Sequence, residues 1–241
     1  MARHLREDLS SVCVFRDEDD LIGGQDWRRA LETAMASADA AIVLAGSDWA
    51  GGARPGERRI DDVEDPVREE VRQALSPSTR VRAIPVLLDG ASPAPNVPDD
   101  IAELFDAPHR VDSSRLDLES GGGEGYQRVL VSIWEALRAR VPNGLLVIGS
   151  EQNETALDQF VQQLKDRGAV DEARSLSRRY AGAYILSRRE SKKVLKSVPD
   201  AIVLVDADAG AEHLLRVAAY VGLRTTREVR LVGSGAAAAF A

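Results

Sequence analysis

The chain has 241 residues, of which 44% are hydrophobic and 29% are charged, a composition typical of a soluble globular protein. Its 31 basic residues are outnumbered by 39 acidic ones, and the resulting net charge of −8 argues against non-specific nucleic-acid binding. One cysteine, Cys13, excludes an internal disulfide and a cysteine-based zinc site, and three scattered histidines argue against a histidine-rich metal site.

No apolar run reaches the roughly 18 residues that a membrane-spanning helix needs. The N-terminal stretch "MARHLREDLSS" has no apolar signal-peptide core. We therefore expect a cytoplasmic protein with neither a membrane nor a nucleic acid among its partners.

Apolar strand-like runs alternate with helical patterns from the N-terminus onward, which is typical of α/β proteins with a mainly parallel sheet. Residues 4–11 predict a short helix and residues 12–15 ("VCVF") a short strand. A polar loop leads to a helix that begins at about Asp26. Its expected apolar face consists of residues at helical spacing, namely Trp27, Ala30, Leu31, Ala34 and Met35. Residues 40–46 ("AAIVLAG") predict a strand buried on both faces.

A long loop rich in glycine and charge precedes a helix at residues 67–75, and loops of this length are often functional or mobile. Residues 81–90 predict a third strand, in which Pro85 indicates a bend or a bulge. Residues 109–114 are expected to add a short edge strand and residues 120–125 ("SGGGEG") a flexible loop. A helix from Tyr126 to about Arg140 closes this half.

The stretch "VPNG" at residues 141–144 indicates a domain boundary, because the alternation of strands and helices restarts after it. Strands are expected at "LLVIGS", "AYILS", "DAIVLVD" and "EVRLVGS". Helices are expected at "ETALDQFVQQLKDRG", which Gly168 ends, and at "AEHLLRVAAYVGL". The predicted organisation is therefore one α/β domain at residues 1–141 and a smaller α/β module at residues 144–241.

The helix at residues 67–75 carries two adjacent glutamates with different expected environments. At about 100° per residue, Glu69 falls opposite the apolar face, towards water, and Arg72 three residues later offers an ordinary ion pair. Glu70 falls at the edge of the apolar face and has no basic residue at helical spacing. Partial desolvation then predicts a raised pKa unless a tertiary partner exists, which makes Glu70 a candidate functional residue. The alternative is that Glu70 only favours the positive end of the helix dipole near Pro66.

Three segments together resemble a Toll/interleukin-1 receptor (TIR) domain of the bacterial type. They are "VFRDEDDLIGGQDWRRAL", "ADAAIVLAGSDWA" and "DPVREEVRQAL" followed by "VRAIPVLLDG". The resemblance covers roughly residues 2–141 and implies a flavodoxin-like parallel sheet there. The second half, residues 144–241, is separately expected to form a smaller Rossmann-like module. Many bacterial and plant TIR domains cleave NAD with one glutamate on the third helix, and the pattern "VREEV" places Glu70 in that position.

The resemblance further implies a nucleotide pocket after the second strand of the family, where Phe15, Arg16 and Asp17 stand. Arg16 could bind a phosphate in bidentate fashion, or it could pair with the acidic residues that follow it. Ser47 and Trp49 follow the next strand at its carboxyl end, where open α/β sheets bind ligands. Trp49 could stack on a base or on nicotinamide, or it could only pack within its loop. Trp27 is expected in the core.

The expected reaction releases nicotinamide from NAD, which is the substrate and not a cofactor, and no metal is expected. Nicotinamide is cationic while attached and departs neutral, so no general acid is required. One carboxylate can stabilise the oxocarbenium-like transition state. The resemblance leaves open whether the product is linear or cyclic ADP-ribose.

Two features depart from the family pattern. Pro66 occupies the position four residues before Glu70, where the family usually has an aromatic residue. The family's first strand and its loop are missing, since the sequence begins within the expected first helix. A truncated or misassigned start, a strand supplied by the second half, or a degenerate domain without catalysis would each account for this.

In the second half, "VLVDADAGAEHLLRVAAYVG" and "VIGSEQNET" faintly resemble nucleotide-binding strand-to-helix turns, although plain α/β turns are the favoured explanation because such turns are common. The expected role of this module is to sense a signal, such as a nucleotide, or to drive assembly. The hypothesis is a homo-oligomeric NAD-cleaving enzyme of antiphage defence or stress response. The alternatives are a non-catalytic adaptor that self-associates and an inactive truncated protein.

Overall fold

A computed structural model of the chain describes residues 1–9, 13–16, 26–51, 56–92, 97–105, 110–150, 154–177, 181–188, 190, 201–205, 218 and 229–233. These residues belong to two units, each with its own sheet. The first contains Phe15–Val129 with Met1, and the second contains Ala2–Val14 with Leu130–Ala241. The α/β class expected from the sequence is thereby confirmed.

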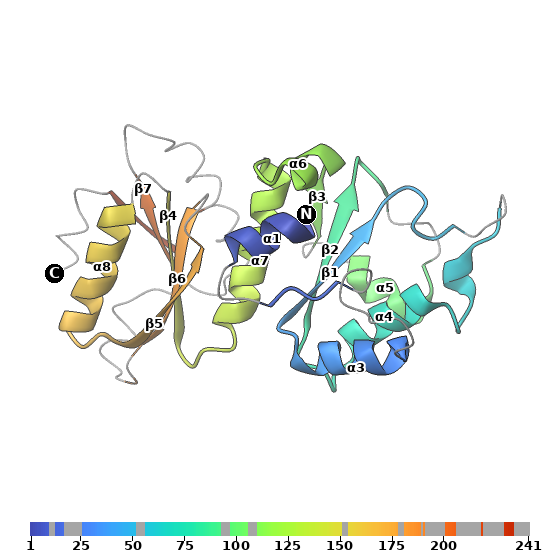
Figure 1. The fold of residues 1–241 in the computed structure, drawn as a ribbon, viewed down its shortest axis with the longest axis horizontal. Helices are drawn as coiled ribbons and strands as arrows, with labels where there is room; N and C mark the ends of the chain where they lie inside the picture. The colour runs from blue at the N-terminus through green and yellow to red at the C-terminus, as the bar shows by residue number, and fades with distance from the viewer. Residues whose placement is uncertain are drawn as a thin grey trace. The chain divides into compact units, whose positions relative to one another are not determined.

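The first unit is built on a three-stranded parallel sheet in the order β1-β2-β3 (Figure 1). The strands are β1 (Ala40–Ala45), β2 (Arg82–Leu88) and β3 (Val111–Ser113). The longer helices are α3 (Trp27–Ser37), α4 (Pro66–Leu75) and α7 (Glu124–Arg138), which ends in the second unit. The shorter helices are η1 (Arg59–Asp61), α5 (Asp99–Ala102), η2 (Glu103–Phe105) and α6 (Arg115–Ser120).

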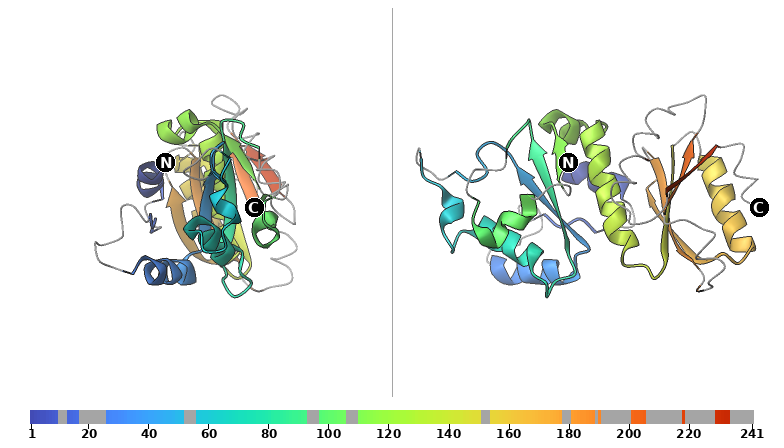
Figure 2. Two further views of the ribbon diagram at one scale, coloured as in Figure 1. Left: turned by 90° about the vertical axis from the view of Figure 1, so that its right-hand side faces the viewer. Right: turned by 180° about the vertical axis from the view of Figure 1, so that it is seen from behind.

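Helices α3 and α4 lie side by side, and α4 also packs on β2 and α5 (Figures 1 and 2). The α4 side of the sheet is filled by one apolar cluster. Its buried members are Ala45, Ala50, Ile60, Val71, Leu87, Ile101, Leu104 and Phe105. The apolar face of α3 is less buried than expected, because each of its five predicted residues, Trp27 included, is only half-buried.

The expectation that β1 is buried on both faces is wrong. Five of its six residues are half-buried or exposed, and Leu44 keeps 40% of its surface in solvent. Among the described residues β1 pairs only with β2, so it lies at an edge of the sheet instead of between two strands. The expected strand at residues 12–15 is also absent from its described part, since residues 13–16 have no regular secondary structure.

Pro85 does not produce the expected bulge against β1. The parallel register runs without a shift from Ala40 opposite Arg82 to Ala45 opposite Leu87. Pairing with β3 starts only at Val86 opposite Val111. Pro85, which has no N–H group, therefore precedes the part of β2 that pairs with β3, so no hydrogen bond between these two strands is lost.

The second unit has a mixed five-stranded sheet in the order β5-β6-β4-β7-β8. Its strands are β4 (Gly144–Ser150), β5 (Val170–Ser177), β6 (Ala181–Arg188), β7 (Ala201–Val205) and β8 (Val229–Gly233). Helix α8 (Glu154–Asp166) packs on β4 and β5 (Figure 1), and α1 (Ala2–Asp8) belongs to the same unit. Because β6 is antiparallel to both β4 and β5, this sheet is not the all-parallel sheet of a Rossmann-like fold.

The stretch at residues 141–144 is held by two arginines of the second unit. Arg188 donates from Nε to the carbonyl of Asn143 at 2.7 Å, and Arg138 donates to the carbonyl of Gly144 at 3.4 Å. Arg188 is buried, and Asn143 adopts a left-handed φ of 52°. This stretch is therefore a fixed turn within the second unit, and the separation of residues 1–141 and 144–241 into two domains stays a prediction.

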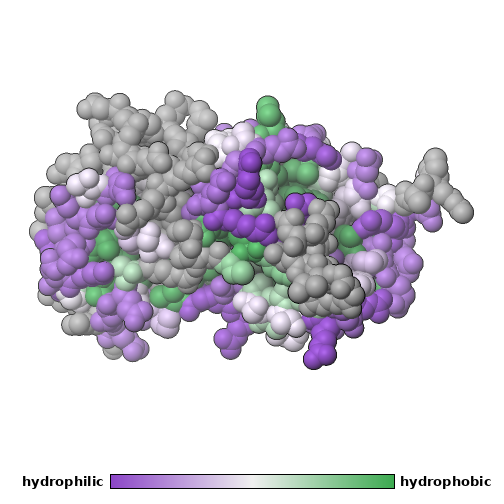
Figure 3. All heavy atoms as spheres, in the orientation of Figure 1, coloured by the Kyte–Doolittle hydropathy of each residue, from purple (hydrophilic) through white to green (hydrophobic). Residues whose placement is uncertain are grey.

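On the face shown in Figure 3, hydrophilic residues cover most of the described surface, with hydrophobic residues reaching it between them. The exposed large hydrophobic residues of the described part are Phe15, Leu44, Val63 and Leu116. None of the helices in that part is long and apolar enough to cross a lipid bilayer.

Candidate functional site

The carboxyl ends of β1, β2 and β3 lie at one edge of the first sheet, because the three strands are parallel. Gly46 and Ser47 follow β1, Asp89 follows β2, and Ser114 and Arg115 follow β3. Open parallel sheets bind ligands at this edge, where the loops after the strands leave room. Ser47 is exposed there, consistent with its expected position.

Helix α4 begins at the same carboxyl edge of the sheet, because it connects the carboxyl end of β1 to the amino end of β2. Asp65 caps it by accepting hydrogen bonds from the backbone N–H groups of Val67 at 2.9 Å and Arg68 at 3.1 Å. Pro66 occupies the first turn, where a missing N–H group costs nothing. Asp65 is 8% exposed and also pairs with Arg59 at 3.3 Å, so this helix start is well fixed.

Glu69 is committed to neighbours on its own helix. Its carboxylate pairs with Arg72 at 3.2 Å, as the sequence predicts, and also accepts a hydrogen bond from Gln73 at 3.0 Å. Its side chain is 32% exposed, so it faces water less fully than expected. These two contacts account for Glu69 as a structural residue.

Glu70 is half-buried and directly precedes Val71, which is 1% exposed. Its position at the edge of the apolar face is therefore as expected. It is not an isolated carboxylate, since it takes part in at least one interaction. Burial alone does not separate the two glutamates, since both are half-buried.

The opposite flank of α4 is occupied by Arg68. This arginine binds both carboxylate oxygens of Asp100 in α5, at 2.9 and 3.2 Å, and donates to the carbonyl of Asp61 at 2.9 Å. Its side chain is only 12% exposed. At helical spacing, Glu70 lies on the other side of the buried residues Val71 and Ala74, away from Arg68.

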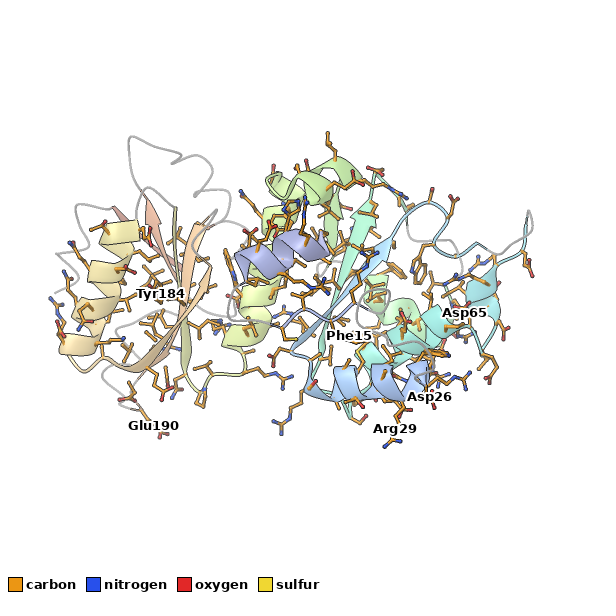
Figure 4. The ribbon with its side chains drawn as sticks, in the orientation of Figure 1. Phe15, Asp26, Arg29, Asp65, Tyr184 and Glu190 are labelled. Carbon is orange, nitrogen blue, oxygen red and sulfur yellow. The ribbon has the colours of Figure 1, made fainter. Side chains whose placement is uncertain are left out.

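The structure describes only some of the residues that were expected to line a nucleotide pocket before α3. Phe15 is 41% exposed and lies on the segment between α1 and α3 (Figure 4). Arg16 is exposed as well, and Asp17 lies outside the described residues. The proposed pocket contribution of these three residues stays a prediction.

Trp49 packs against the apolar cluster of the first unit. Its ring meets that of Phe105 edge to face, with centroids 5.0 Å apart and planes at 76°. This arrangement is what the loop-packing alternative predicts. Trp27 is half-buried, and the guanidinium of Arg28 lies 5.4 Å from its ring centroid.

Sequence reasoning missed one polar arrangement at the carboxyl edge. Asp89 has a left-handed φ of 54° and accepts from the backbone N–H of Arg115 at 2.9 Å. The Nε atom of Arg115 also lies 3.2 Å from this carboxylate. The dipeptide "DG" after the strand signals a turn, but nothing in the sequence links it to an arginine 26 positions later.

Within the described ranges, no group of three or more histidine, cysteine, aspartate or glutamate side chains could hold a metal ion. In the second unit, residues 151–153, which follow β4, and the stretch that contains Gly210 and Glu212 lie outside the described residues. The nucleotide-binding role suggested for them stays a prediction.

Comparisons with known proteins assign no family to this chain: no protein-family model, no curated protein and no solved structure matches it significantly.

Proposed function

We propose that the first unit is a TIR-like domain with a flavodoxin-like arrangement, which cleaves the nicotinamide–ribose bond of NAD. Glu70 is the proposed catalytic carboxylate. The observation that carries the proposal is the placement of Glu70, which is half-buried on the flank of a helix that starts at the carboxyl edge of a parallel sheet. The order of β1, α4 and β2 along the chain is the order that the TIR resemblance implies.

The chemistry needs one carboxylate and no metal. Nicotinamide leaves as a neutral molecule, so the main task of the site is to stabilise positive charge on the ribose. A half-buried carboxylate does this better than an exposed one, because solvent screens the exposed charge more strongly. Glu70 is assigned this role because the TIR resemblance places it in the catalytic position, whereas Glu69 binds Arg72 and Gln73 on its own helix.

The wider proposal follows from the resemblance. NAD is the substrate, the chain assembles into a homo-oligomer in the cytoplasm, and residues 144–241 respond to a signal or support assembly. The setting is a bacterial defence or stress response. Within the first unit, Phe15, Arg16, Asp17, Ser47 and Trp49 are the proposed substrate contacts.

The test is nicotinamide release from NAD by concentrated full-length protein, comparing wild type with Glu70→Gln and Glu69→Gln. Both substitutions keep the side-chain size and remove one charge from adjacent positions of α4. We expect Glu70→Gln to reduce turnover roughly 100-fold or more. Glu69→Gln should stay within about threefold of wild type, since it alters only a partly exposed ion pair. Activity that survives in Glu70→Gln would refute the catalytic assignment.

A second candidate function is a non-catalytic module that self-associates. It is favoured by β1, whose apolar sequence "AAIVLA" is mostly half-buried and pairs with β2 alone among the described strands. Unpaired apolar edges readily pair with another strand. A wild-type protein that assembles with rising concentration but never releases nicotinamide would support this module over the enzyme.

A further inference from the structure

Arg115 stands where the carboxyl ends of the three parallel strands meet. It follows β3 directly after Ser114, and it contacts Asp89 just beyond the end of β2. It also reaches the end of β1, because a Cβ atom added to Gly46 would lie 3.2 Å from its Nη2 atom. One guanidinium thus spans the ends of strands that are far apart in sequence.

Asp89 contacts Arg115 at both its backbone and its guanidinium. One carboxylate oxygen accepts from the backbone N–H of Arg115 at 2.9 Å, and the other lies 3.2 Å from Nε. Asp89 itself is held by a 2.9 Å hydrogen bond from its backbone N–H to the carbonyl of Ser113. The left-handed φ of Asp89 is a conformation that a residue other than glycine seldom adopts without such support.

The outer part of the guanidinium remains available. Within the described chain, neither Nη1 nor Nη2 of Arg115 has a hydrogen-bond acceptor, and its side chain is 64% exposed. Four N–H donors in one plane match the oxygens of a phosphate group. Glycine at position 46 leaves the space next to Nη2 without a side chain. The next residue in the chain, Leu116, is 73% exposed.

We infer that Arg115 binds a phosphate group of a nucleotide at the carboxyl edge of the first sheet, with Asp89 as its positioning residue. The identity of the nucleotide as NAD rests on the proposed function. The binding of a phosphate at this arginine does not depend on NAD cleavage. Since no catalytic step is assigned to Arg115, its loss should weaken substrate binding more than turnover.

The experiment titrates the full-length protein with ADP, adenosine and inorganic phosphate by calorimetry, for wild type and Arg115→Gln. The matched control is Arg110→Gln. Arg110 is also a partly exposed arginine beside an aspartate, but it precedes β3 at the opposite end of that strand. Thermal unfolding of each variant verifies that it is folded.

We expect wild type to bind ADP more tightly than either adenosine or inorganic phosphate. Arg115→Gln should weaken ADP binding about tenfold or more, as the loss of charge-assisted hydrogen bonds predicts, and leave adenosine binding unchanged. Arg110→Gln should change neither. Gly46→Val, which crowds Nη2, should weaken ADP binding in the same direction.

Equal ADP affinity in wild type and Arg115→Gln would overturn the inference, as would a wild type that binds no ADP. Inorganic phosphate that binds as tightly as ADP would overturn the nucleotide assignment. Failure of the proposed function looks different: wild type would bind ADP through Arg115 but release no nicotinamide. Conversely, NAD cleavage with the same KM in Arg115→Gln and wild type would uphold the enzyme and refute the role of Arg115.

Discussion

Replacing Asp65 by alanine should destabilise the start of α4, the helix that carries Glu70. Asp65 makes two cap hydrogen bonds of 2.9 and 3.1 Å while being 8% exposed. Loss of a helix cap costs about 0.5–2 kcal/mol, and the low exposure places this one towards the upper end. The pair with Arg59 adds only a few tenths of a kcal/mol, roughly, because that arginine is 44% exposed. The free energy of unfolding of the first unit should therefore fall by about 2 kcal/mol.

The assay is urea unfolding followed by tryptophan fluorescence, with two comparison variants. Asp65→Asn keeps a good cap acceptor and should lose less than about 1 kcal/mol. Asp26→Ala removes the corresponding cap of α3 (Figure 4). Asp26 is exposed and its cap hydrogen bonds are longer, at 3.0 and 3.4 Å. This variant should therefore lose about 0.5–1 kcal/mol of its free energy of unfolding. An equal loss in Asp65→Ala and Asp26→Ala would refute the argument that burial makes the cap of α4 stronger.

Three further predictions concern single side chains. Arg68→Ala should lower the free energy of unfolding by about 1–3 kcal/mol in the same urea assay, because it removes a largely buried arginine that makes two hydrogen bonds to the partly exposed Asp100. A loss below about 0.5 kcal/mol would contradict this prediction. Arg138→Ala should cost about 3 kcal/mol or more by thermal or urea unfolding, since it removes the partner of Glu135, which is fully buried. Leu44→Lys should change the free energy of unfolding by no more than roughly 0.5 kcal/mol, because Leu44 is 40% exposed. If β1 is the strand through which the chain assembles, the same variant should show no concentration-dependent assembly in light scattering.

Most helices and strands of the described chain could be predicted because their apolar residues are periodic. The cap residues Asp26 and Asp65 and the terminal Gly168, with its φ of 63°, carry signals that local chemistry explains. Strand β5 was missed, because it carries Asp171, Glu172 and Arg174 and lies at a sheet edge, where charged residues are common.

The strand predicted at residues 12–15 is absent from its described part, and β1 is less buried than predicted. An apolar run predicts a buried strand only if neighbouring strands cover it, and coverage is a property of the whole sheet. The described part of β1 lacks a neighbour on one side, so its residues stay half-buried despite their composition. The Asp89 and Arg115 pair could not be predicted for a related reason, since it depends on a left-handed turn and on the register of β2 with β3.

The direction of Glu70 depends on residues that look ordinary in the sequence. Val71 and Ala74 fix which side of α4 faces the core, and Arg68 anchors one flank through Asp100. Together these contacts set the rotation of the helix about its axis, and Glu70 must then project from the other flank. A catalytic carboxylate needs such support, since an error of about 1 Å in its position can cost roughly 100-fold in rate. Arg68→Lys keeps the charge but loses the bidentate hydrogen bonds to Asp100. Its effect on the rate of any NAD cleavage, expressed as a free energy, should therefore exceed its effect on the free energy of unfolding.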